Sequence, residues 1–256
     1  MVFRTALGRL CIFCGETVDL REGFVCSECA RQIEERRLLI RPEENLRSVA
    51  LYRYQGTVRR GLHRFKYGGR AEFGKVCGAM LADWFRARRE QADVITCVPR
   101  AKDGRPRLYN QSELLAKTMA KELKIPFDPH LLSKRKGFPS QTDCPTPKAR
   151  EENAKRAYRS GRSTRDLRGK RVVLVDDLYT TGATAAACEK ILRKQGVAKV
   201  LVYTATAAVW EYKTLKKRLS AECVRVQFGD VRHFCNRRFS LAAPGKRFSC
   251  PVEKSP

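Results

Sequence analysis

Two adjacent carboxylates end an apolar run in the segment VVLVDDLYTTGAT, residues 172–184. Because like charges repel, Asp176 and Asp177 require compensation from elsewhere in the fold. The residues after them are rich in hydroxyl groups and open a helix, whose free N–H groups and dipole favour an anion. Carboxylates can accept the hydroxyl groups of a sugar while a phosphate sits at the helix start. The pattern therefore predicts a site for a ligand shaped like a ribose 5-phosphate.

Two other interpretations of the acidic pair compete with this one. An apolar run followed by two aspartates is also typical of the metal-binding strand of P-loop NTPases, but the motif G-x-x-x-x-G-K-[ST] of that class occurs nowhere in the chain. The remaining alternative is a capped helix after a strand, with both acids merely solvated. The glycine and the threonines that follow the acids favour the ligand site.

A second chemically active group lies near the N-terminus, where four cysteines are spaced C-x2-C-x11-C-x2-C: Cys11, Cys14, Cys26 and Cys29. Two such pairs bring four thiolates around one ion, the closed tetrahedral arrangement of a structural Zn²⁺ site. Residues 1–45 are too few to bury a core of their own, so metal binding would supply their folding energy. Chance spacing or two disulfides is the alternative.

The chain is strongly basic, with 53 Lys and Arg against 27 Asp and Glu in 256 residues. The formal charge of +26 predicts a polyanionic partner, which would meet the body and tail because residues 1–45 carry 7 basic and 8 acidic side chains. No apolar run approaches the roughly 20 residues that span a bilayer, and the first residues lack a signal-peptide pattern. We therefore expect a cytoplasmic protein with no membrane insertion.

Apolar patterns predict the elements that position these groups. Strands are expected at residues 48–54, 93–99, 171–177 and 199–206, and helices at residues 57–70, around 76–85, and at 112–124 and 182–195. Strands that alternate with helices indicate an α/β fold with a mostly parallel, doubly wound sheet. In such sheets, ligands bind beyond the carboxyl ends of the strands, where the acidic pair lies.

The ends and connections of these elements also carry signals. Ser112 is the expected N-cap of its helix, and Gly196 is the expected residue just past the end of the last helix. Residues 41–44 are interpreted as part of a linker, and residues 133–158 as a long mobile loop that enters a helix.

Two basic segments allow more than one interpretation. The stretch at residues 57–70 presents either a solvated face or a phosphate-facing set, with Lys66 at its end. In residues 207–256, Trp210 and Tyr212 lie among basic side chains, as in some single-strand binders, although helix packing is the alternative. A second metal site in that segment would have irregular spacing: Cys223, His233, Cys235 and Cys250.

The segment VVLVDDLYTTGAT is similar to the phosphoribosyl pyrophosphate (PRPP) signature of type I phosphoribosyltransferases. Three more segments resemble one branch of that family, the ComF-type competence proteins, in the same order: YRYQGTVRRGLHRFKYGGR, VPRAKDGRPRLYNQSELLA and SQTDCPTPKAREENAKRAY. The N-terminal four-cysteine module belongs to the same resemblance, which covers roughly residues 8–206. It divides the chain into a zinc module (1–45), a phosphoribosyltransferase-like domain (46–206) and a basic extension of unknown role (207–256).

The resemblance implies a role for each matching residue. The acidic pair would hold the ribose hydroxyls and act in any catalysis. The residues that would hold the 5-phosphate are Thr180, Thr181, Gly182, Ala183 and Thr184. The residues that would face the pyrophosphate are Arg100, Ala101 and Lys102, with Mg²⁺ carried mainly by oxygens of the ligand and water. The residues of a family loop and a mobile hood are Arg107, Asn110, Gln111, Gln141, Arg150 and Asn153.

The resemblance also implies a function. ComF-type proteins act in DNA uptake and natural transformation, which implies single-stranded DNA as a partner, a competence helicase as another, and PRPP as a ligand. The alternative is an active phosphoribosyltransferase that transfers ribose 5-phosphate from PRPP to a nitrogen nucleophile. One departure concerns the family's Gly-Phe, which appears here as Leu108-Tyr109 and places a bulky residue where glycine's freedom is often used.

Overall fold

The computed structural model describes residues 9–18, 23–34, 37–42, 47–100, 108–138 and 146–208. A central sheet in these residues has the strand order β3-β4-β9-β8-β5. Its strands are β3 (Arg37–Pro42), β4 (Arg47–Arg53), β5 (Val94–Cys97), β8 (Arg171–Tyr179) and β9 (Lys199–Ala207). The pairs β4–β9, β9–β8 and β8–β5 are parallel, and only edge strand β3 is antiparallel to its neighbour. The predicted mostly parallel sheet is confirmed.

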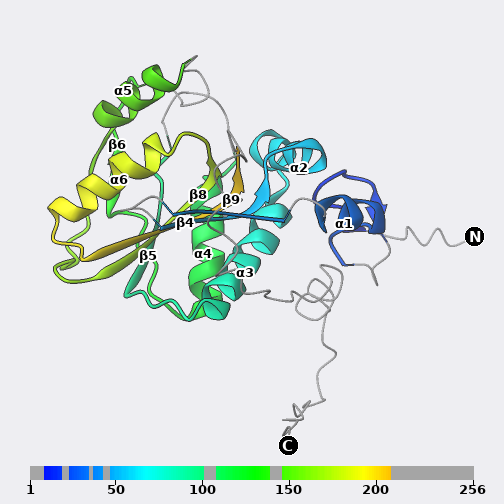
Figure 1. Ribbon diagram of the computed structural model, residues 1–256, viewed down its shortest axis with the longest axis horizontal. Helices are drawn as coiled ribbons and strands as arrows, with labels where there is room; N and C mark the ends of the chain where they lie inside the picture. The colour runs from blue at the N-terminus through cyan, green and yellow to red at the C-terminus, as the bar shows by residue number, and fades with distance from the viewer. Residues whose placement is uncertain are drawn as a thin grey trace, which may run out of the picture.

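Helices cover both faces of this sheet, as a doubly wound fold requires (Figure 1). The helices are α2 (Gly56–Tyr67), α3 (Ala71–Ala87), α4 (Gln111–Leu123), α5 (Pro147–Ala157) and α6 (Ala183–Lys194). Alternate residues of β8 point to opposite faces: Val173 and Val175 join a core with α2, α3 and α4, whereas Val172 and Leu174 join a core with α5 and α6. This two-sided burial explains the continuous apolar run before the acidic pair.

The N-terminal module packs against α2 (Figure 1). It consists of β1 (Arg9–Leu10), β2 (Thr17–Val18) and α1 (Ser27–Glu34). Phe13 is fully buried, and its ring meets Tyr52 and Phe73 of the main domain edge-on at centroid distances of 5.6 and 5.7 Å. The approach is close, because a Cβ at Gly61 of α2 would stand 2.9 Å from the carbonyl oxygen of Ile12. The module therefore buries its apolar side chains against the main domain.

Two connections differ from their predictions. The residues expected to begin a linker instead end strand β3, whose Leu39 lies opposite Ala50 of β4. The expected long loop contains β6 (Leu132–Lys134) and β7 (Tyr158–Ser160), which pair antiparallel. Helix α5 starts in the same stretch after Thr146, whose hydroxyl accepts a hydrogen bond from the N–H of Ala149 at 3.1 Å. Strands β3, β6 and β7 form because each pairs with another segment of the chain.

Two element boundaries also differ. Helix α4 begins at Gln111, so Ser112 is not its N-cap; Asn110 holds that position without a side-chain bond. Strand β8 continues through Tyr179, so the turn after the acidic pair starts later than predicted. The prediction for Gly196 is confirmed, because it follows the C-cap of α6 with φ +86°. In the described part of the chain, every helix is too short or too polar to cross a membrane.

Candidate functional site

The acidic pair, two residues before the end of β8, is held by contacts from α2 and α4. The hydroxyl of Ser112 in α4 donates to Oδ1 of Asp176 at 2.8 Å, and the N–H of Asp177 donates to the same oxygen at 2.9 Å. Lys66, in the last turn of α2, places its Nζ 3.0 Å from Oδ1 of Asp177. Both partners of this ion pair have side chains only 13% exposed. Lys66 therefore supplies the compensating charge and is not part of a solvated face.

The two carboxyls differ in their surroundings. Asp176 is half-buried, and desolvation raises its pKa to about 7, with a further contribution from the charge of Asp177. The Ser112 hydroxyl, the Asp177 N–H and the Lys66 ammonium act in the opposite direction. Asp176 consequently exchanges its proton near neutral pH.

This raised pKa predicts a pH dependence of stability. Asp176 favours the folded state fully below its unfolded pKa of about 4, and this contribution is lost as the pH rises through about 7. Between pH 5 and pH 8, the free energy of unfolding should fall by roughly 2 to 3 kcal/mol more in the wild type than in Asp176→Asn. Denaturant unfolding at both pH values measures this difference.

Asp166→Asn is the control for this pH prediction, because Arg168 lowers the pKa of that exposed carboxyl to about 2, outside the tested range. The control should follow the wild type. Parallel pH profiles for wild type and Asp176→Asn would contradict a raised pKa at Asp176.

The turn between β8 and α6 is compact and depends on one glycine. Gly182 is the N-cap of α6 with φ +81°, and a Cβ there would stand 2.4 Å from the hydroxyl oxygen of Tyr179. The Thr181 hydroxyl accepts a hydrogen bond from the N–H of Ala183 at 3.4 Å. Since the first N–H groups of a helix lack partners within it, this turn presents donors to an anion.

Gly182→Ala should lower the free energy of unfolding by roughly 1 to 3 kcal/mol, because a left-handed backbone is costly for other residues, and by more through contact with Tyr179. Gly169→Ala is the matched control, since Gly169 has φ +69° and open space around it. Denaturant unfolding should show the larger loss at residue 182, and adding Tyr179→Phe should recover part of it. Equal losses at the two glycines would exclude crowding in the turn.

The segment that departs from the family pattern is anchored on α2. The Tyr109 hydroxyl donates to the carbonyl oxygen of Phe65 at 2.8 Å, and the Gln111 amide donates to that of Lys66 at 3.3 Å. Leu108 is 86% exposed, so its side chain has room at the position where the family has glycine. Tyr109 helps to fix the end of α2 that carries the lysine.

The structure brings together some predicted site residues and leaves others outside the described part. Arg100 follows β5, Asn110 occupies the N-cap position of α4, and Asn153 lies half-buried in α5. The predicted residues outside the described part are Ala101, Lys102, Arg107 and Gln141, together with the side chain of Arg150 and the proposed groups of the 207–256 extension beyond residue 208. Sequence reasoning missed Ser112 as a partner of the acidic pair, because its position matched a helix cap equally well.

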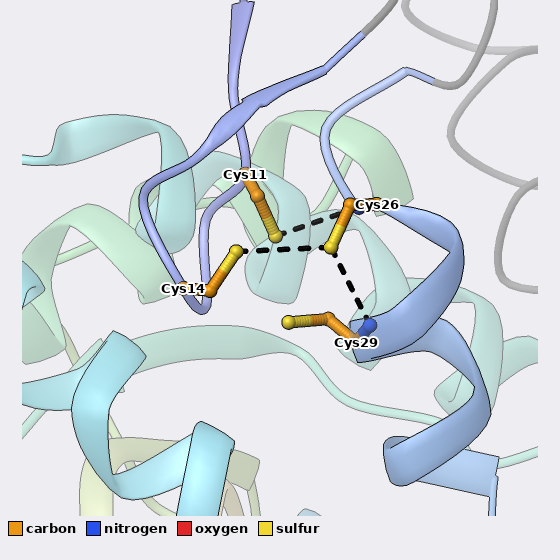
Figure 2. A group of neighbouring side chains, drawn as sticks. All are labelled: Cys11, Cys14, Cys26 and Cys29. Carbon is orange, nitrogen blue, oxygen red and sulfur yellow. Dashed lines mark hydrogen bonds between the residues drawn. The ribbon is translucent and has the colours of Figure 1, made fainter.

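The four cysteines of the N-terminal module form a compact cluster (Figure 2). Their sulfurs all lie within 4.8 Å of one another, and none of the four forms a disulfide. The Sγ atoms of Cys14 and Cys26 are 3.7 Å apart, close to the edge of about 3.8 Å expected for a tetrahedron with metal–sulfur bonds of about 2.3 Å. This group can therefore hold a metal ion.

Hydrogen bonds from backbone N–H groups favour the deprotonated form of the cysteine sulfurs. Backbone N–H groups of Cys26 and Cys29 donate to Cys11 and Cys26 at 3.4 Å each (Figure 2). A bond with Cys29 lowers the pKa of Cys11 to about 4, while the same bond raises the pKa of Cys29. A cation would take the place of the shared proton, since metal ligands must be thiolates.

Two contacts connect this cluster to α2. The sulfur of Cys29 lies 3.5 Å from the hydroxyl of Thr57 in the first turn of the helix. Further along, Arg64 donates from Nη1 to the carbonyl oxygen of Phe13 at 2.7 Å. The helix that delivers Lys66 to the acidic pair is therefore also the helix on which the cysteine module rests.

Comparison with known proteins identifies the family of this chain. Residues 71–236 match the phosphoribosyl transferase domain family. The chain belongs to this family. The match includes the acidic pair and the turn after it, but not the cysteine module or α2, which precede it. The boundaries at residues 45 and 206 therefore stay predictions.

Similar proteins carry names that refer to DNA utilization or to competence. The DNA utilization protein YhgH of Salmonella typhi is 26% identical over 219 residues, which cover 76% of this chain and 95% of that protein. Competence protein ComFC of Bacillus subtilis is 27% identical over 203 residues, 77% of each chain. Competence protein F of Haemophilus influenzae is 35% identical over 95 residues, 37% of this chain and 41% of that protein. The predicted ComF-type resemblance is confirmed.

Proposed function

We propose that this protein binds PRPP together with Mg²⁺ and acts in the cytoplasm on DNA taken up during natural transformation, with single-stranded DNA as its polymeric partner. The observation that carries the proposal is the acidic pair at the end of β8, compensated by Lys66 and followed by the turn that opens α6. A site with sugar-accepting carboxylates beside phosphate-accepting N–H groups matches the two ends of a ribose 5-phosphate.

Each part of the site has a role in this proposal. Oδ1 of Asp176 already accepts two hydrogen bonds, so its other oxygen, with those of Asp177, accepts the ribose hydroxyls. The residues from Thr180 to Thr184 hold the 5-phosphate. Arg100 and Lys66 face the diphosphate, whose charge Mg²⁺ further balances when bound through ligand oxygens and water. The site thus orients the sugar and neutralises both phosphate ends.

The DNA role has separate support. Similar proteins are named for DNA utilization and competence, and a charge of +26 favours a polyanion. The four-cysteine cluster, which we propose binds structural Zn²⁺, holds the N-terminal module on α2. A competence helicase is a further proposed partner, which the ComF-type resemblance implies.

A second candidate function is phosphoribosyl transfer, favoured by the presence of both carboxylates in the site. In that reaction the bond from C1 of the ribose to the pyrophosphate oxygen breaks, and pyrophosphate leaves with the electron pair. A nitrogen nucleophile forms the new bond to C1 and releases a proton. The carboxylates would tolerate the positive charge that develops on the sugar ring.

Calorimetric titration of the wild-type protein with PRPP and Mg²⁺ tests the binding proposal, and a pyrophosphate-release assay with adenine, guanine and hypoxanthine tests the alternative. Binding with no release favours a PRPP-binding DNA-handling protein, whereas release with one base identifies a transferase. Absence of heat and of competition with labelled PRPP would reject the site.

A further inference from the structure

A large cavity lies beside the end of β5, next to the proposed PRPP site. Its volume is about 1150 Å³. The lining comes from the end of β5, the start of α4 and the antiparallel pair β6–β7, which approach from distant parts of the sequence. We call this strand pair the hairpin, although α5 connects its strands. This volume exceeds the range of roughly 300 to 1,000 Å³ that is usual for small-molecule sites. We call it the hairpin groove.

The lining of the hairpin groove is strongly cationic. In the described part of the chain, the charged residues that line it are Arg100, Lys134, Arg135, Lys136, Arg159, Arg162 and Glu113. Six cations therefore face one carboxylate in a recessed surface. Concave surfaces that carry one sign of charge concentrate the field and attract a polyanion.

The cations of the hairpin are held by neutral partners. Arg159 donates from Nε to the hydroxyl of Ser133 at 3.2 Å, and Arg162 lies 3.4 Å from Nε2 of His130. Arg135 and Lys136 are exposed. Within the described residues, none of these four cations forms an ion pair. Hydrogen bonds to neutral groups orient a guanidinium without removing its charge.

Asp128, an acid near the β6–β7 strands, is already engaged. Asp128 lies 3.7 Å from Nε of Arg165 and accepts a hydrogen bond from Ser163 at 2.6 Å and from the N–H of His130 at 2.8 Å. It does not line the groove. The positive charge of the hairpin groove therefore remains available to a ligand.

We infer that the hairpin groove binds the sugar–phosphate backbone of single-stranded nucleic acid. This inference rests on the proposed function and assigns its single-stranded DNA to a particular surface of the protein. Among the described residues, the groove lining contains no aromatic side chain on which a base would stack, so recognition should be independent of sequence. A flexible single strand can adapt its backbone to a recessed surface, whereas a duplex with a persistence length of about 50 nm is stiff. Four cations outside the PRPP site supply the phosphate contacts.

A groove variant and a charge-matched control test this inference. The groove variant is Arg135→Ala, Lys136→Ala, Arg159→Ala and Arg162→Ala combined. The control is Lys75→Ala, Lys117→Ala, Lys121→Ala and Lys190→Ala combined, four exposed lysines that do not line the groove. Both variants lose four positive charges, and all eight side chains are exposed, so folding should be retained. Circular dichroism and thermal melting verify this.

The probe is a fluorescein-labelled oligothymidylate of about 20 nucleotides, followed by anisotropy over a range of NaCl concentrations. Since each neutralised phosphate of a single strand contributes roughly 0.7 to the log–log salt slope, the groove variant should lower the slope by roughly 2 to 3. Its affinity at low salt should fall by tenfold or more. The control should change both quantities much less, and the duplex form of the probe should bind the wild type more weakly than the single strand.

Several results would overturn the inference. Equal losses in the groove and control variants would mean that only total charge matters, and an unchanged groove variant would place the strand elsewhere. A stronger affinity for the duplex would exclude a single-strand groove. Loss of PRPP affinity by the same factor as DNA affinity would assign the groove to the PRPP site. PRPP titration of the groove variant separates these failures from failure of the proposed function, because the hairpin inference predicts unchanged PRPP binding.

Discussion

Cys11→Ser combined with Cys26→Ser is expected to remove one equivalent of Zn²⁺ and to lower the thermal stability of the protein sharply. Structural zinc sites in small peptides contribute about 10 to 16 kcal/mol of binding free energy, and this energy is lost with the ligands. The damage should extend beyond the module, because Phe13 packs between Tyr52 and Phe73 of the main domain. Elemental analysis and thermal melting measure the two effects.

Cys77→Ala provides the control for this experiment, since Cys77 is fully buried in α3 and lies outside the cysteine cluster. It should lose some packing energy and keep its zinc. A metal content that is unchanged in the double serine variant would reject the four-cysteine site. A different metal in the purified wild type would keep the site but revise its ion.

Asp176→Asn combined with Asp177→Asn is expected to weaken PRPP binding by roughly 1.5 to 3 kcal/mol for each charge-assisted hydrogen bond lost, or at least tenfold per bond. Asparagine keeps the size of the side chain, so the loss would report on charge and acceptors. Lys66 would also lose its carboxylate partner, which lies 3.0 Å away in the wild type. Calorimetric titration with PRPP and Mg²⁺ at pH 8, where Asp176 is ionised in the wild type, measures the difference.

Asp166→Asn serves again as the control, because that exposed carboxylate pairs with Arg168 and takes no part in the site. It should bind PRPP as the wild type does. The double asparagine variant should keep its zinc and its affinity for single-stranded DNA, since those sites are separate. Equal PRPP affinities for the wild type and the double variant would remove the acidic pair from the proposed site.

Local patterns predicted the parts of the fold that depend on neighbouring residues. Strand β8 was recognisable because four successive apolar residues precede Asp176, and a strand buried on both faces needs such a run. The cysteine spacing predicted the cluster because both cysteines of each C-x2-C pair lie close together along the chain. The end of α6 followed from Gly196, which has the positive φ typical of a residue past a helix end.

Contacts between distant segments were not predictable from such patterns. Strand β3 exists because Leu39 and Ile40 pair with β4, and the charged residues around them indicated a linker instead. Ser112 met the requirements of a helix cap, and only the packing of α4 against β8 turns its hydroxyl toward Asp176. The hairpin groove depends on Ser133 lying opposite Arg159, a pairing across 26 residues.

Helix α2 has a consequence for how this protein can change over evolutionary time. Its first turn meets Cys29 through Thr57 and its last turn supplies Lys66, so about 14 Å of helix axis separates the two contacts. A lineage that lost the cysteines would also lose the support that positions the lysine. The two centres should therefore be inherited as one unit, and gene fusions or truncations that divide them at α2 should not persist.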